Sequence, residues 1–150
     1  TCAREVSRRA VDRVMRIILD TNILLSALMA RGTPTDRLYE AWRHGRFELV
    51  STERQIEELR QVVRRPFFQA RLKASETGRM INDIRRLAAM FDSLPAVSRS
   101  PDPADDFLLA LCEAAGADYL ATGDKSHLLA LGRHGATRIV SARDLAELLG

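Results

Sequence analysis

The order of apolar and polar positions along the chain predicts short strands that alternate with helices. The stretch 14–19 is apolar except for Arg16, which is typical of a central strand covered on both faces. Shorter apolar stretches predict further strands at 47–50, 119–122 and 138–140. Alternation of strands with helices favours a parallel sheet with right-handed crossovers. The expected fold is therefore of the α/β class, a three-layer α/β/α sandwich with a central, mostly parallel sheet.

Helices are expected where apolar residues recur at helical spacing and capping residues mark the ends. Thr52 and Gln55 have the spacing of a capping box at the start of one helix. Asp102 followed by Pro103 marks the start of another, which ends at Gly116. The helices are expected over residues 23–30, 35–44, 52–65, 76–91, 102–115, 126–131 and 142–149.

The length of 150 residues and the 46% share of hydrophobic residues fit one domain with a buried core. Residues 1–13 contain four arginines, lack an initiating Met and show little apolar periodicity. We interpret them as an N-terminal extension, either poorly ordered or left by cloning. The folded domain is expected over residues 14–150.

Neither membrane insertion nor export is expected. The longest apolar stretches, 17–30 and 107–121, are interrupted by charged or amide residues before they reach the roughly 20 residues of a membrane span. The basic N-terminus lacks the apolar segment and cleavage site of a secretory signal. Cys2 and Cys112 show neither metal-ligand spacing nor the density of a disulfide scaffold. These features predict a soluble protein of the reducing cytoplasm.

Charge is distributed unevenly along the chain. The formal net charge is only +3, but 21 of the 23 basic residues are arginine, whose planar guanidinium suits phosphate. Residues 54–86 contain nine basic and four acidic side chains, whereas residues 102–124 contain six acids and no lysine or arginine. The sequence therefore combines a basic segment with an acidic one.

Four acidic residues fall where a strand or loop leads into a helix. Asp20 closes the first strand, and Asp124 follows the strand that ends at Thr122. Glu58 and Asp106 lie in the opening turns of helices. Because ligands of an open parallel sheet bind beyond the carboxyl ends of its strands, we expect these acids to meet at one edge.

Carboxylates that lie so close repel one another, which raises their pKa values unless a cation neutralises them. Oxygen ligands favour hard ions such as Mg²⁺ or Mn²⁺. The histidines, His44, His127 and His134, lack the HExxH spacing, which argues against a zinc hydrolase. We therefore expect Mg²⁺ or Mn²⁺, the usual arrangement for phosphoryl transfer.

Some of the acids near the later helix have ordinary structural explanations. Asp102 fits a helix cap, and Asp105 fits the third helical position, where an acid favours the helix dipole. Asp106 lies beyond the capping positions and directly precedes an apolar run, so a functional role is favoured. Of the pair Glu57 and Glu58, the second lies nearer the apolar face of its helix and is the better ligand candidate.

For the acids that follow strands, a structural role and a functional role explain each residue about equally well. Asp20 can cap the helix after the first strand, and Asn22 can be an ordinary turn residue. Asp124, in Thr-Gly-Asp, can be a turn aspartate. Their combination at corresponding junctions favours the functional interpretation.

Four sequence blocks resemble the signature of PIN-domain ribonucleases. They are Leu19-Asp20-Thr21-Asn22, Glu58-Leu59 in a helix that begins near Ser51, Asp102-Pro103-Ala104-Asp105-Asp106, and Thr122-Gly123-Asp124. The resemblance covers about residues 15–150, and the four blocks occur in the family's order and with similar spacing. More narrowly, the chain resembles VapC-like proteins, the toxin components of bacterial toxin–antitoxin systems.

The resemblance implies metal-dependent hydrolysis of RNA phosphodiester bonds. The implied site residues are Asp20, Glu58, Asp106 and Asp124 as the catalytic cluster, Asp105 as a candidate further metal ligand, and Asn22, Thr122 and Ser126 as polar support. Asp20, Asp106 and Asp124 would bind Mg²⁺ or Mn²⁺, while Glu58 would orient the metal shell or the attacking water. Many relatives carry an acid at the position of Ser126, so a second metal site would be weaker or absent.

The resemblance also implies partners. It predicts an RNA substrate, a homodimer, and an antitoxin whose segment blocks the acidic cleft with an arginine or lysine. The mostly apolar stretch 24–29 offers a dimer interface. The side chains that could steer an RNA backbone are Arg60, Arg64, Arg65, Arg71, Arg85 and Arg86. A solvated helix face explains these arginines equally well.

Three other interpretations remain open. A catalytically inactive PIN-like module would bind a protein partner, hold no metal and cut nothing. A phospho-accepting receiver-type domain also has acids at strand ends, but it needs adjacent acids after the first strand and a lysine that Lys125 matches poorly. A flap-type nuclease directed at DNA would share the metal chemistry, and only substrate tests would separate it.

Overall fold

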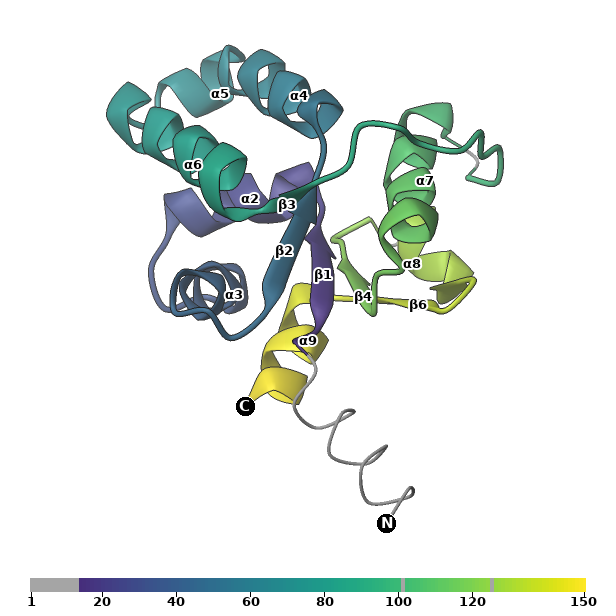
Figure 1. The fold of residues 1–150 in the computed structure, drawn as a ribbon. Helices are drawn as coiled ribbons and strands as arrows, with labels where there is room; N and C mark the ends of the chain where they lie inside the picture. Colours follow the sequence, from purple (N-terminus) through teal and green to yellow (C-terminus); the bar gives the residue numbers. More distant parts are fainter. Residues whose placement is uncertain (1–13, 101, 125) are drawn as a thin grey trace.

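The computed structural model describes residues 14–100, 102–124 and 126–150 (Figure 1). The expectations for residues 1–13 lie outside these described residues. Within them, six strands form one sheet. The strands are β1 (Arg16–Leu19), β2 (Glu48–Ser51), β3 (Ala89–Met90), β4 (Tyr119–Ala121), β5 (Arg133–His134) and β6 (Thr137–Val140).

The strand order is β3-β2-β1-β4-β6-β5. All neighbours pair in parallel except β5, which is antiparallel to β6. β1 therefore has β2 on one side and β4 on the other, and the carboxyl ends of all three strands lie at the same edge. The expected mostly parallel α/β sheet is confirmed.

Helices occupy most of the chain between the strands. They are α2 (Thr21–Met29), α3 (Pro34–Arg43), α4 (Glu53–Val63), α5 (Pro66–Gln69), α6 (Ala74–Leu87), the 3-10 turn η1 (Pro103–Asp105), α7 (Asp106–Ala115), α8 (Leu128–Leu131) and α9 (Ala142–Leu149). Within the described residues, every helix is too short or too polar to cross a lipid bilayer.

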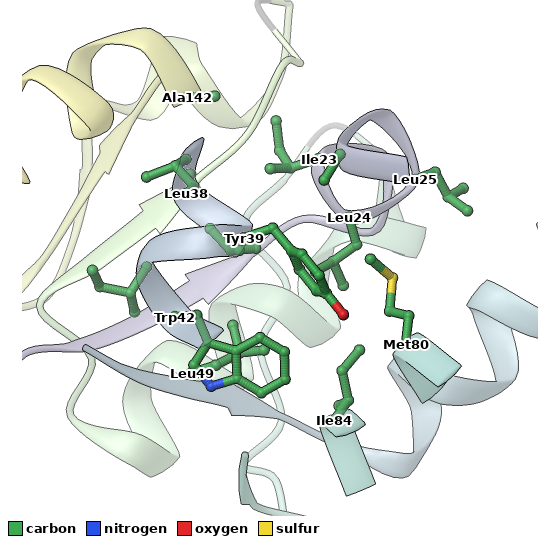
Figure 2. Close-up of a cluster of buried hydrophobic side chains, with 14 of the residues drawn as sticks. Ile23, Leu24, Leu25, Leu38, Tyr39, Trp42, Leu49, Met80, Ile84 and Ala142 are labelled. Atoms are coloured by element: carbon green, nitrogen blue, oxygen red, sulfur yellow. The ribbon is translucent and has the colours of Figure 1, made fainter. Parts of the chain in front are cut away.

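The side chains of β1 alternate between two buried clusters. Ile17 and Leu19 pack in a cluster with α2, α3, α4, α6 and α9, whereas Ile18 packs in a second cluster with α7 and α8. Figure 2 shows part of the first cluster, in which the rings of Tyr39 and Trp42 meet edge to face with 5.6 Å between centroids. Because successive strand residues point to opposite faces, helices cover both sides of the sheet.

The helix expected over 76–91 is wrong at its carboxyl end. α6 stops at Leu87, and residues Ala89–Met90 form β3 beside Val50 and Ser51 of β2. A two-residue strand is too short to show a period of its own, and only pairing with its neighbour defines it. The short β5 was missed for the same reason, because it exists only through its pairing with β6.

The capping box expected at Thr52 and Gln55 is also wrong. Gln55 is fully buried; its Nε2 donates to the carbonyl of Leu19 at 2.7 Å, and its Oε1 accepts from Ser51 Oγ at 2.6 Å. With both ends of its amide satisfied inside the core, the side chain does not reach back to the helix start. Gln55 instead ties α4 to the end of β1.

The first turn of α4 is capped from a distant segment. Asp92, which follows β3, accepts through Oδ1 from the backbone N–H of Glu53 at 3.0 Å and from Thr52 Oγ1 at 3.3 Å. An aspartate that accepts from the first helical N–H groups stabilises a helix start. The helix is thus fixed at both its sheet side and its amino end.

The cap and the end expected for the later helix are confirmed, but a 3-10 turn, η1, occupies Pro103–Asp105 before α7 begins at Asp106. Asp102 accepts from the backbone N–H of Ala104 at 3.0 Å, as a capping residue does. α7 ends at Gly116, whose φ of 60° is left-handed and favours glycine. These two ends direct the amino terminus of α7 toward the same sheet edge as the end of β1 (Figure 1).

Candidate active site

Asp20 lies directly after β1 at the carboxyl edge of the sheet. Its backbone N–H donates to the carbonyl of Ala121 at 2.9 Å, and the residue is only 8% exposed. The hydroxyl of Thr122 donates to its Oδ2 at 2.7 Å. Burial raises the pKa of this carboxyl, the Thr122 hydroxyl opposes the shift, and the negative charge of Glu58 adds to it.

Thr122 joins two of the predicted acids. This fully buried residue follows β4, and its Oγ1 donates to Asp20 and accepts from the backbone N–H of Asp124 at 3.1 Å. A single hydroxyl therefore fixes the Asp20 carboxylate and the backbone position of Asp124. These hydrogen bonds are compatible with the supporting role that the family resemblance implies for Thr122, which stays a prediction.

Asp124 is held on its other side by His127. The backbone N–H of His127 donates to Oδ1 of Asp124 at 3.1 Å, and its ring Nδ1 lies 3.2 Å from Oδ2. Burial acts to raise the pKa of Asp124, but His127 and the side chain of Asp105 outweigh it, so the pKa is lowered. The lowered pKa favours the ionised form of Asp124.

Asp105 has the most perturbed carboxyl of the cluster. Its pKa is raised from 3.8 to about 7, first by burial and then by the negative charges of Asp20 and Asp102 and by the side chain of Asp124. The family resemblance implies only that Asp105 is a candidate further ligand. The structure nevertheless brings it beside both Asp20 and Asp124, from another connection of the sheet.

Asp106 directs its carboxylate elsewhere. It is buried, and its Oδ1 accepts from the backbone N–H groups of Arg99 at 3.1 Å and Ser100 at 2.8 Å. These contacts hold the loop that precedes η1. Of the two successive aspartates, Asp105 interacts with the other acids and Asp106 organises the loop, so the sequence-based preference for Asp106 as a ligand gains no support from these contacts.

Glu58 approaches the cluster from α4. The side chain is half-buried, and its charge contributes to the raised pKa of Asp20. Gln55, one turn earlier, anchors this part of α4 to the carbonyl of Leu19. The preference for Glu58 over Glu57 fits these contacts, since Glu57 is exposed and pairs with Arg60 at 3.0 Å.

The remaining polar candidates lie at the margin. Asn22 is exposed in the first turn of α2, where its backbone N–H, like that of Thr21, lowers the pKa of Asp20. Ser126 is exposed beside His127. Sequence reasoning missed His127, whose position three residues after Asp124 was the available signal.

The donor set fits a divalent cation. One ligand atom each from Asp102, Asp105 and His127 lies within 4.8 Å of the others, and ligands of a single ion are separated by roughly 3–5 Å. Burial raises the pKa of Asp105 most, and the negative charges of Asp20 and Asp102 raise it further; a bound cation would offset both effects. The oxygen-rich set suits Mg²⁺ or Mn²⁺, and the imidazole adds a nitrogen donor that the sequence did not predict.

The six predicted backbone-steering arginines are spread over α4 to α6 and differ in their contacts. Three of them form ion pairs, Arg60 with Glu57, Arg85 with Glu53 at 2.9 Å and Arg86 with Asp83 at 3.7 Å. Arg71 packs 3.8 Å above the ring centroid of Phe67, while Arg64 and Arg65 are exposed around the end of α4.

Comparison with known proteins identifies one family. A family model described as "PIN domain" matches residues 16–126. This range includes Asp20, Glu58, Asp105 and Asp124. No curated protein and no solved structure matches the chain.

Proposed function

This chain belongs to the PIN domain family, whose members are generally nucleases, and from that premise we propose that it is a divalent-metal-dependent endoribonuclease. The observation that carries the proposal is the convergence on Asp105. Its pKa of about 7 reflects burial together with the charges or side chains of Asp20, Asp102 and Asp124. Acids from separate connections of the sheet thus act on one another, as a cation site requires.

In this proposal Asp105 holds Mg²⁺ or Mn²⁺ together with Asp20 and Asp124, whose side chains act on it. Asp102 and His127, which each place a ligand atom within 4.8 Å of one from Asp105, are further ligand candidates at the same position. When bound, the cation lowers the pKa of a water molecule and offsets the charge of the scissile phosphate. Asp105 replaces Asp106 in the ligand set, because the side chain of Asp105 acts on Asp20 and Asp124, whereas Oδ1 of Asp106 accepts two backbone N–H groups of the preceding loop. Asp106 positions that loop and does not touch the reacting atoms.

The supporting residues keep the ligands in place. The Thr122 hydroxyl orients Asp20 and ties down the backbone of Asp124. The half-buried Glu58 orients the attacking water or accepts its proton. His127 limits the movement of the Asp124 carboxylate through its backbone N–H.

The finer biological role is a further part of the proposal. We propose that the protein acts in the cytoplasm as the toxin of a toxin–antitoxin pair and that it forms homodimers through α2, where Met29 is exposed. An antitoxin with an arginine or lysine at its tip would complement the acidic cluster. The exposed Arg64 and Arg65 provide charge for an RNA backbone.

The test uses the purified full chain and a labelled single-stranded RNA of mixed sequence. We expect cleavage with Mn²⁺ or Mg²⁺, none with EDTA, and none by Asp20→Asn with either ion. A DNA strand of the same sequence and a DNA flap substrate run in parallel. Cleavage of DNA but not RNA would indicate a DNA nuclease and contradict the ribonuclease proposal. Absence of cleavage of every substrate would favour an inactive binding module.

A further inference from the structure

A cavity of about 460 Å³ lies between the start of α4, the segment 94–98 and the first turns of α7. Its apolar walls include Leu94, Pro95, Val97 and Pro103, and its polar lining includes Arg54 and Ser98. The volume falls within the roughly 300–1,000 Å³ typical of small-ligand pockets. None of the proposed metal ligands lines it.

An arginine stacked on a buried ring forms one side of this cavity. The guanidinium of Arg54 lies 4.8 Å from the ring centroid of Phe107, which is only 4% exposed. Arg54 itself is exposed. A planar guanidinium that lies over a ring and is exposed to solvent is a surface on which unpaired bases of single-stranded RNA stack.

The segment that walls the cavity is fixed at both ends. Before it, Asp92 accepts from the backbone N–H of Glu53 at 3.0 Å. After it, Asp106 accepts from the backbone N–H groups of Arg99 and Ser100, and Arg99 Nη1 donates to the carbonyl of Arg133 at 2.9 Å. The cavity is therefore formed before any ligand arrives, which lowers the entropy cost of binding.

The cavity adjoins the acidic cluster through two elements. On α4, Arg54 precedes Glu58 by four residues, a spacing that places both on the same side of a helix. At the start of α7, Asp106 lines the cavity, while the preceding residue, Asp105, belongs to the cluster. A nucleotide whose phosphate lies at the carboxylates would therefore have its neighbouring base within reach of Arg54.

We propose that this cavity receives one base of the single-stranded RNA substrate, next to the scissile phosphate, and that Arg54 stacks on that base. The proposal deepens the ribonuclease function and rests on it for the identity of the ligand. It makes Arg54 a base-binding residue, whereas the more distant arginines contact only the backbone.

The experiment measures binding without cleavage. The Asp20→Asn protein, with Arg54 intact or replaced by Ala or Lys, is titrated in Mg²⁺ with a labelled RNA hexanucleotide and with a set of hexanucleotides that each lack one base. With Arg54 intact, loss of the base at one position should weaken binding about ten-fold. With Arg54→Ala or Arg54→Lys, loss of that base should cost less than about two-fold, because the stacking partner is already gone.

Arg64→Ala is the matched control, since Arg64 is an exposed arginine ten residues further along the chain, at the carboxyl end of α4. Removing its charge should weaken binding of every oligonucleotide equally and leave the ten-fold effect of the missing base unchanged. Melting curves should show all four proteins folded, with the Arg54 variants lower in Tm by a few degrees at most because they lose the contact between Arg54 and Phe107.

Three results overturn the inference: no single base position matters, the effect of the missing base persists in Arg54→Ala, or the protein does not bind RNA. These results are distinguishable from failure of the nuclease proposal, which is judged on the unsubstituted protein with Mn²⁺. If the protein cuts RNA but no base position affects binding, the nuclease proposal stands and the base-pocket proposal fails. If one base position affects binding through Arg54 but the protein does not cut RNA, the base-pocket proposal stands and the nuclease proposal fails.

Discussion

Asp105 and Asp106 are adjacent in the chain, yet their carboxylates act on different parts of the molecule. The pKa of Asp105 is raised to about 7 by burial, by the charges of Asp20 and Asp102, and by the side chain of Asp124. Asp106 instead accepts the backbone N–H groups of Arg99 and Ser100. This division between a cation ligand and a loop anchor underlies the first prediction.

Asp105→Asn should abolish most activity, whereas Asp106→Asn should preserve it. An asparagine at 106 keeps the Oδ1 that accepts both loop N–H groups, so we expect kcat/KM to fall about five-fold or less. An asparagine at 105 removes a charged ligand and should lower kcat/KM about 100-fold or more. Steady-state RNA cleavage by both variants measures the difference.

Asp106→Ala is the control for this pair. It removes the acceptor for two backbone N–H groups and should lower the free energy of unfolding by about 1–3 kcal/mol, measured by urea denaturation. If Asp106→Asn were the inactive variant and Asp105→Asn the active one, the assignment of the two residues would have to be exchanged.

Thr122 provides a second prediction, because its hydroxyl lowers the pKa of Asp20 against the effect of burial. Thr122→Val keeps the size of the side chain but removes the donor, so the pKa of Asp20 should rise. The acidic limb of the pH profile of kcat/KM should then move to higher pH, and the affinity for Mn²⁺ should fall about ten-fold.

Thr122→Ser restores the hydroxyl and should return the acidic limb to its original position. An unchanged limb in Thr122→Val would mean that Asp20 does not control this part of the profile. The serine variant also separates the hydrogen bond from packing, since it lacks the methyl group that valine retains.

The third prediction concerns stability without metal. A carboxyl with a higher pKa in the folded than in the unfolded state stabilises the fold when protonated. For Asp105 this contribution is complete below pH 3.8 and is lost as the pH rises through about 7. In EDTA, Asp105→Asn should therefore gain stability over the unsubstituted protein as the pH increases from 5 to 8.

Because Asp105 is partly exposed, solvent screening limits the gain to about 1 kcal/mol, or roughly 2–4 °C in Tm. Glu147→Gln on α9 is a control, since Glu147 is exposed and lies outside the acidic cluster. Thermal melting at the two pH values measures the effect. Saturating Mn²⁺ should reverse the order, making the unsubstituted protein the more stable one; a pH-independent difference in EDTA would contradict the account.

The sequence predicted the fold correctly where a local pattern of residues determines how distant segments come together. β1 is mostly apolar and is followed by Asp20. Asp102 caps the turn η1 that leads into α7, and α7 ends at Gly116. Each of these features depends on neighbouring residues in the chain. The convergence of acids at one edge follows from parallel topology, which the alternation of strands and helices already indicates.

The failures arose where a side chain is satisfied by a distant partner. Gln55 has the spacing of a capping box, but its side-chain amide hydrogen-bonds to Leu19 and Ser51 inside the core. Asp92 caps α4 from 39 positions away in the chain. Asp105 and Asp106 are neighbours in the chain, and the geometry of the turn η1 decides which of them faces the other acids. The spacing of apolar residues does not predict that geometry.

The most direct test is the anomalous scattering of crystals of the full chain soaked in Mn²⁺. The account predicts a manganese peak bounded by the carboxylates of Asp20, Asp105 and Asp124, with the carboxylate of Asp106 still on the backbone of Arg99 and Ser100. A well-diffracting crystal with no peak among these three acids, or with manganese on Asp106 and away from Asp105, would contradict it.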